Sequence, residues 1–204
     1  MEWLASFTDL VLHLDKHLVF FVQQYGDWVY ALLFAIIFVE TGIVVAPFLP
    51  GDSLLFVAGA LCVTEGMSLP LLMVLLVVAA ILGDALNYSI GHWFGDALIK
   101  RTRLISAEKL KYTEQFFEKH GPKTIVIARF LPIVRTMAPF VAGFGGMKPQ
   151  RFFFYNVTGG LLWVVSLTLA GYLFGNIPFI KNNLTAVILV IIFVSILPGI
   201  IAVL

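Results

Sequence analysis

Charged side chains are scarce in this sequence. Only 12% of its 204 residues are Asp, Glu, Lys or Arg, whereas apolar residues make up 60%. Soluble domains carry about 25% charged residues, and a water-soluble fold could not hide so much apolar surface. The low charge therefore excludes an ordinary soluble domain and indicates a protein whose solvent is lipid.

Cysteine is nearly absent as well. A single cysteine, Cys62, excludes an intramolecular disulfide and a thiolate metal site, and we interpret it as a small buried hydrophobe. His13 and His17 are four residues apart, as zinc ligands on a helix can be, but no third ligand accompanies them. We therefore favour an interfacial helix face there and expect neither a metal nor a cofactor. The N-terminus also lacks the basic segment of a cleavable signal peptide.

Strict alternation of apolar and polar residues is rare, which argues against a membrane β-barrel. The long apolar runs instead predict an all-α polytopic membrane protein. Residues 1–28 are mixed and predict an amphipathic, interfacial helix, and residues 29–204 form the single membrane domain that we expect. Segments 69–92, 152–175 and 184–204 are long enough to span, because about 20 residues cross the hydrocarbon core.

Two further apolar segments are interrupted by polar or helix-breaking residues. The first covers about 29–64, and the second covers 124–146. Broken backbone at membrane depth survives only where protein or a wet cavity covers it. We therefore interpret both segments as re-entrant helical hairpins. The interrupting residues are Glu40, Gly42, Pro47, Pro50, Gly51 and Asp52 in the first segment and Arg129, Pro132, Arg135 and Pro139 in the second.

Basic residues gather in residues 93–123, which hold seven of the 13 Lys and Arg. The positive-inside rule places this loop in the cytoplasm. Residues 106–122 within it predict a surface helix that ends at Gly121-Pro122. The basic residues adjoin membrane spans without interleaved aromatic platforms, so we expect no nucleic-acid partner and consider anionic lipids instead.

The chain repeats itself. FLPGDSLLFVAG (48–59) is similar to FLPIVRTMAPFVAG (130–143), and GHWFGD (91–96) is similar to GYLFGN (171–176), 80 residues later. Met67 and Met147 keep that offset. With the basic loop in the cytoplasm, the first broken segment opens to the outside and the second to the inside. Inverted repeats with broken helices are typical of secondary transporters; chance similarity between apolar sequences is the alternative.

Four ionisable residues stand out in the broken segments: Glu40, Asp52, Arg129 and Arg135. Each costs about 3 kcal/mol at the bilayer centre, so such residues pair or line a wet cavity. The first half supplies acids and the second supplies arginines, and we expect them to meet where the two segments meet. The arginines would bind a lipid phosphate through their guanidinium forks, and the carboxylates could exchange protons. A static Asp52–Arg135 ion pair is the alternative.

Other residues are expected to support this site. The helix starts after Pro50-Gly51 and at Pro132 would offer backbone amides to a phosphate. Spacing places Asp84, Asn87 and Tyr88 on one helix face, and Asn156, Gly160 and Trp163 on another. We expect both faces to point inward, with the two asparagines bonding between helices. The supporting residues predicted here are Pro50, Gly51, Asp84, Asn87, Pro132, Thr136, Asn156 and Trp163.

At these residues the sequence resembles the DedA family of VTT-domain, or SNARE-associated, membrane proteins over about residues 9–200. The resemblance rests on the acid in FVETG, on FLPGD, ARFLPIVRT and AGFGGM, and on N-x3-G-x2-W. It implies a bacterial inner-membrane protein with two opposed re-entrant helices that translocates lipid. Family members resemble flippases of undecaprenyl phosphate or phosphatidylethanolamine, with proton coupling. The family's functional acids correspond to Glu40 and Asp52, and its functional arginines to Arg129 and Arg135.

Two functions follow as expectations. The first is a proton-coupled flippase of a phosphate-bearing lipid, such as undecaprenyl phosphate or a phospholipid. The second is a proton or small-ion antiporter that supports membrane potential and envelope homeostasis. A lipid phosphatase is disfavoured because no nucleophile is arranged beside the arginines, so we expect no enzyme activity; a structural scaffold is a further alternative. The expected partners are the lipid substrate, the bilayer and protons, and homo-oligomerisation stays open.

Overall fold

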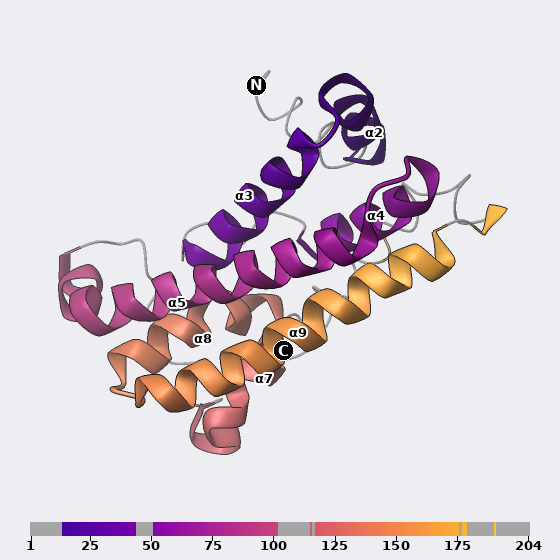
Figure 1. Ribbon diagram of the computed structural model, residues 1–204. Helices are drawn as coiled ribbons and strands as arrows, with labels where there is room; N and C mark the ends of the chain where they lie inside the picture. The colour runs from indigo at the N-terminus through magenta and orange to yellow at the C-terminus, as the bar shows by residue number, and fades with distance from the viewer. Residues whose placement is uncertain are drawn as a thin grey trace.

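The structure is a computed structural model that describes residues 14–43, 51–101, 115, 117–175, 177–178 and 190. The described residues form helices and no strand, which confirms the all-α prediction (Figure 1). The helices are α2 (Leu14–Tyr25), α3 (Trp28–Gly42), α4 (Gly51–Thr64), α5 (Leu69–Arg101), the 3₁₀ turn η1 (Gly121–Lys123), α7 (Thr124–Ala128), α8 (Pro132–Phe144) and α9 (Pro149–Phe174).

Two of these helices are long and apolar enough to cross a membrane. They are Leu69–Phe94 within α5 and Pro149–Phe174, which is the whole of α9. Helix α5 continues to Arg101 instead of ending at residue 92, because a helix can leave the hydrocarbon core without losing its backbone hydrogen bonds. The predicted span 184–204, residues 1–13 and most of the predicted 106–122 helix lie outside the described residues.

The exposed face of α5 is apolar, unlike the exposed face of a helix in a soluble protein. Large apolar side chains recur on its exposed face at helical spacing: Leu71, Val74, Val78, Leu82 and Leu86. Its buried face carries Asp84 and Asn87. Burial of the polar groups and exposure of the apolar stripe is the arrangement that a lipid solvent favours.

The second interrupted segment is broken where its sequence predicts. Helix α7 ends at Ala128, and α8 begins at Pro132, with Leu131 in an extended conformation between them. Proline disfavours the helical conformation of the residue before it and suits the first helical position. Pro139, which was also counted as an interruption, instead lies inside α8. In the first segment α3 ends at Gly42 and α4 begins at Gly51.

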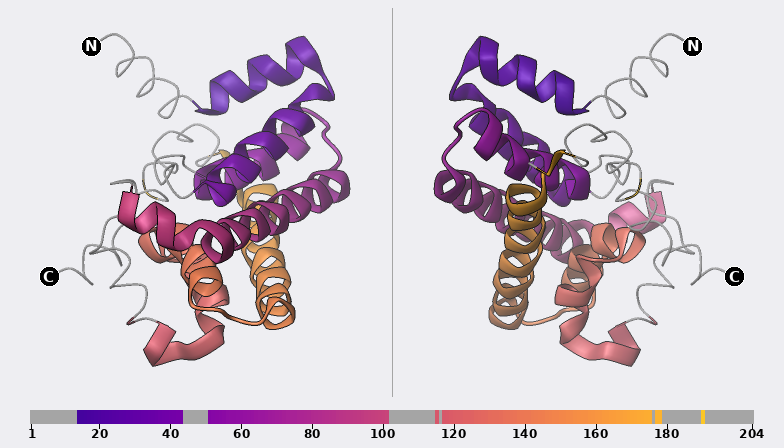
Figure 2. Two further views of the ribbon diagram at one scale, coloured as in Figure 1. Left: turned by 90° about the vertical axis from the view of Figure 1, so that its left-hand side faces the viewer. Right: turned by 90° about the vertical axis from the view of Figure 1, so that its right-hand side faces the viewer.

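Helices α4 and α8 each pack on the long helix of the other half of the sequence. Helix α4 lies along the C-terminal part of α9, and α8 lies along the C-terminal part of α5 (Figure 1). Helix α3 also packs on α5. Helix α2 lies at one end of the molecule, far from α7 (Figure 2). The packing thus interleaves the two halves of the sequence.

Close contacts at two glycines hold each of these helix pairs together, and the two sets of glycines are equivalent in the repeat. A Cβ on Gly59 of α4 would overlap the carbonyl of Thr168, and one on Gly171 of α9 would overlap that of Phe56. In the other pair, Gly143 of α8 meets the carbonyl of Tyr88, and Gly91 of α5 meets that of Phe140. Glycine permits such close helix approach. The sequence repeat therefore recurs as two matching helix crossings.

The turns after these short helices also match. Gly66 precedes α5 with a φ of 71°, and Gly146 precedes α9 with a φ of 70°. Left-handed backbone of this kind favours glycine. The turns are tied by tyrosine hydroxyls: Tyr30 accepts from the Ser68 amide over 2.7 Å, and Tyr88 donates to the Met147 carbonyl.

Candidate functional site

Arg135 receives two carboxylates from the first half of the chain. Its Nη1 donates to Oδ1 of Asp52 over 2.8 Å, and its Nη2 donates to Oε1 of Glu40. Glu40 lies in the last turn of α3, Asp52 in the first turn of α4, and Arg135 in the first turn of α8. Three helix ends therefore converge on one guanidinium. The structure forms the predicted Asp52–Arg135 pair and adds Glu40 to it.

The start of α4 lies directly against Glu40. A Cβ on Gly51 would overlap the Glu40 carboxylate, so a side chain at that position would displace the acid. The N-terminal end of a helix carries partial positive charge and stabilises a nearby anion. Glu40 is only 1% exposed. Its Oε1 accepts from Arg135, whereas no described residue donates a hydrogen bond to its Oε2.

Arg129 belongs to a second buried group. Its Nη2 donates to Oδ2 of Asp84 over 2.5 Å and to Oδ1 of Asn156 over 2.6 Å. Nδ2 of Asn156 in turn donates to the Ile81 carbonyl over 3.0 Å, which orients the amide. Asp84 had been predicted only as a supporting residue on the inward face of α5. It is the acid that pairs with Arg129, whereas Glu40 and Asp52 both pair with Arg135.

Part of the Arg129 guanidinium has no partner. Among the residues that the structure describes, none accepts a hydrogen bond from its Nε or Nη1, although the side chain is 1% exposed. A buried donor left unsatisfied costs about 1–3 kcal/mol. The guanidinium lies against Gly159, where a Cβ would come within 3.1 Å of its Cδ. Arg129 thus has three N–H groups, one on Nε and two on Nη1, that could donate hydrogen bonds to an anion.

Trp163 touches both groups from α9. Its Nε1 donates to Oδ1 of Asp52 over 2.8 Å. The guanidinium carbons of Arg135 and Arg129 lie 5.0 and 5.8 Å from its ring centroid, a range in which cation–π attraction contributes about 0.5–2 kcal/mol. Trp163 is fully buried. It had been predicted only as a supporting residue, and no short-range pattern indicated its contact with both arginines.

The remaining predicted residues take structural places around the two groups. Nδ2 of Asn87 donates to the carbonyls of Thr41, over 3.3 Å, and Thr136, over 3.0 Å, so it bonds between helices. Thr136 is buried beside Arg135. Pro132 is the first residue of α8, and Pro50 lies outside the described residues.

The arrangement combines two guanidiniums with three carboxyl groups. Three carboxyl groups, from Glu40, Asp52 and Asp84, face two guanidiniums across the two halves of the chain. Such a site can hold an anion on the arginines while a carboxyl group takes up or releases a proton. Within the described residues no group of three His, Cys, Asp or Glu is placed to hold a metal ion.

The chain is similar to several membrane proteins. Residues 49–173 match the VTT domain family. The chain is 54% identical to Protein DedA of Escherichia coli (strain K12), covering 98% of this chain and 94% of that one. It is 42% identical to an uncharacterized membrane protein of Mycobacterium leprae (90% and 85%) and 41% identical to the inner membrane protein YqjA of Escherichia coli (74% and 70%). No solved structure matches it. The VTT domain and the near full-length identity show that this chain belongs to the DedA family of membrane proteins.

Proposed function

We propose that this protein carries a phosphate-bearing lipid, such as undecaprenyl phosphate or a phospholipid, across the bacterial inner membrane, with protons coupled to the movement. The observation that carries the proposal is the pair of buried arginines against one tryptophan ring. Among the described residues no acceptor meets the Nε and Nη1 donors of Arg129, and Arg135 is held by two acids that could release it. A guanidinium fork matches a phosphate bidentately.

The topology that we propose follows the sequence repeat. The first re-entrant hairpin opens to the outside and the second opens to the cytoplasm, which is also the side of residues 93–123. The matching glycine crossings, Gly59–Gly171 and Gly143–Gly91, support this pairing of halves. A pseudo-symmetric frame of this kind suits alternating access, because either half can rock against the other around a fixed site.

Proton coupling would act through Arg135. Glu40 and Asp52 share this one cation, so the group carries one negative charge in excess when both acids are ionised. A lipid phosphate that takes Arg135 would leave both acids without their counter-ion, and protonation would then compensate the lost pairing. In this scheme phosphate binding and proton uptake are linked at the same three side chains.

The test is transport of a labelled phosphate-headed lipid in proteoliposomes with an imposed proton gradient. Arg135→Lys keeps a positive charge for the acids but loses the planar fork, so we expect transport to fall at least tenfold while the protein stays folded. The matched control is Lys123→Gln, which removes an exposed cation. Normal transport by folded Arg135→Lys and Arg129→Lys proteins would exclude the arginines as the phosphate site.

A proton or small-ion antiporter is the second candidate. It is favoured by the excess of acids, since three carboxyl groups face only two guanidiniums. Ion flux that does not depend on a phosphate-headed lipid in the vesicles would support it. We propose a transporter and not an enzyme; release of inorganic phosphate from the lipid during the same assay would instead indicate hydrolysis.

A further inference from the structure

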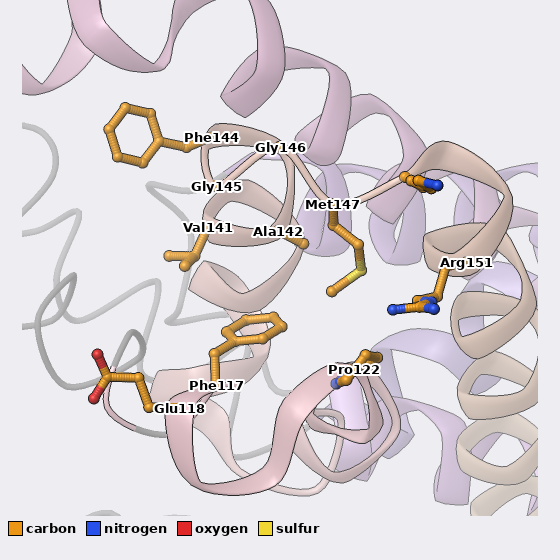
Figure 3. A pocket seen from close by; sticks show the side chains of 11 residues that line it. Phe117, Glu118, Pro122, Val141, Ala142, Phe144, Gly145, Gly146, Met147 and Arg151 are labelled. Atoms are coloured by element: carbon orange, nitrogen blue, oxygen red, sulfur yellow. The ribbon is translucent and has the colours of Figure 1, made fainter.

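A separate pocket of about 670 Å³ lies at the turn between α8 and α9. Its apolar walls include Phe117, Val141 and Met147, and its cations are Lys148 and Arg151. In Figure 3 the Arg151 side chain points into the pocket toward Met147, whereas Glu118 lies on the opposite side. None of these pocket residues belongs to the buried groups around Arg129 and Arg135. The pocket therefore offers an apolar cavity with positive charge on one side.

These features fit the head of a phosphate-bearing lipid. The volume is within the range of about 300–1,000 Å³ that small-molecule sites occupy. Lys148 and Arg151 are exposed, so they can meet a phosphate at the membrane surface, where cations attract anionic lipids. Phe117 packs on the buried α8 cluster that contains Val141. This packing gives the pocket a continuous apolar wall for the first carbons of the lipid's hydrocarbon chains.

The repeat supplies an internal comparison. A second pocket, of about 660 Å³, is lined by the equivalent turn between α4 and α5, by the start of α5 and by residues 27–34 at the start of α3. The α4–α5 turn lies on the opposite side of the molecule from the α8–α9 turn (Figure 1). The lining residues that correspond at an offset of 80 are Gly66 and Gly146, Ser68 and Lys148, and Leu71 and Arg151. Of the described residues that line the second pocket, only Asp27 is acidic or basic. The two pockets lie at equivalent turns of the repeat, and the net charges of their lining residues have opposite sign.

The basic pocket is also close to the buried arginines along both helices that form it. Arg151 precedes Asn156, the amide that bonds Arg129, by five residues, which is about 7.5 Å of helix rise. Val141 follows Arg135 by six residues, or about 9 Å. A phosphate held at Arg151 would therefore have about one to two helical turns to travel before it met a buried guanidinium.

We propose that the α8–α9 pocket is the loading site for the phosphate headgroup of a lipid, and that its repeat counterpart at the α4–α5 turn is the low-affinity side. The inference rests on the proposed lipid transport for its role but not for the binding itself. Lys148 and Arg151 bind the phosphate. At the second pocket, Asp27 and the apolar lining residues disfavour binding of the released lipid phosphate. The charge difference between the pockets at two equivalent turns thereby gives transport a preferred starting side.

The binding test uses phosphatidic acid as the probe and phosphatidylcholine as its zwitterionic comparison, with purified protein and native mass spectrometry. Wild type should retain phosphatidic acid preferentially. The double substitution Lys148→Gln/Arg151→Gln should weaken that binding about tenfold, the equivalent of roughly 1.4 kcal/mol for two exposed charge contacts. Lys119→Gln, which removes an exposed cation that does not line the pocket, should leave it unchanged. Equal losses in both proteins would overturn the pocket as a site.

A reciprocal substitution tests the comparison between the two ends. Ser68→Lys/Leu71→Arg places cations at the equivalent positions, both exposed, and should add a second phosphatidic acid site. In proteoliposomes the Lys148→Gln/Arg151→Gln protein should need about tenfold more lipid for half-maximal transport, with an unchanged maximal rate. Competition by millimolar inorganic phosphate alone would mark a free-anion site and overturn the lipid assignment. If wild type binds phosphatidic acid but transports no lipid, the proposed function fails while the pocket stands.

Discussion

Removal of the Asp84 carboxylate tests the second charge group directly. Asp84 and Arg129 are joined over 2.5 Å, and their side chains are 4% and 1% exposed, so neither can turn to water. Asp84→Asn would leave the buried Arg129 cation without a carboxylate, with only neutral acceptors such as the Asn156 amide and the Ala80 carbonyl among the described residues. Breaking one side of a buried pair costs about 3–5 kcal/mol, because the remaining charge stays buried without compensation.

The same reasoning predicts that Arg129→Gln costs little stability once Asp84 has been replaced by Asn. In Asp84→Asn/Arg129→Gln no charge remains at this pair, and the two amides can bond each other. Arg129→Gln alone also leaves a buried acid without its cation. The double protein should therefore be less destabilised than the sum of the two single proteins by about 2–3 kcal/mol, a coupling typical of directly contacting residues.

The assay is reversible unfolding in mixed detergent micelles, followed by circular dichroism. Glu65→Gln is the matched control, because Glu65 accepts an exposed hydrogen bond from Gln23 over 3.3 Å. The free energy of unfolding of this variant should change by about 0.5 kcal/mol or less. Additive effects of Asp84→Asn and Arg129→Gln, within about 0.5 kcal/mol, would refute the direct buried pair.

Three further predictions concern single side chains. Gly59→Val should lower the unfolding temperature and loosen the α4–α9 crossing, since its Cβ meets a backbone carbonyl, whereas Gly160→Ala should be tolerated because its nearest neighbour is a side-chain carbon at 3.3 Å. Trp163→Phe keeps an aromatic ring beside both arginines but removes the donor to Asp52, so stability in the same unfolding assay should fall by about 1.5–3 kcal/mol. Glu40→Gln should abolish lipid accumulation driven by a proton gradient while leaving exchange down a lipid gradient, and driven accumulation at the wild-type rate would contradict proton coupling through this acid.

Several features of the fold were readable from local sequence. The long apolar runs predict α5 and α9, and the FLP motif predicts the break before α8, because proline acts on its immediate neighbours. The helix extension to Arg101 was missed, since hydropathy reports the depth of the hydrocarbon core and not the end of the helix. Pro139 was given too much weight as a breaker: α8 runs through it.

The sequence predicted which residue types form the candidate site but not which side chains pair with each other. Acids in the first half and arginines in the second predict contact between the halves, and this contact is present in both groups. Asp84 was assigned only a supporting place, because a single acid in a long span carries no local sign of its partner. The repeat, which matches Gly59 with Gly143 and Gly91 with Gly171, could have indicated the two helix crossings in advance.

By itself, the sequence determined a lipid solvent, helical secondary structure, the places where helices break, and an internal repeat with acids in one half and arginines in the other. These properties depend on composition and on neighbours within a few turns. Only the tertiary structure decided that Arg135 holds Glu40 and Asp52, from 95 and 83 residues away, and that Arg129 holds Asp84, 45 residues away. Such pairings depend on how closely α4 meets α9 and α8 meets α5, and that distance is set by glycines on both helices at once.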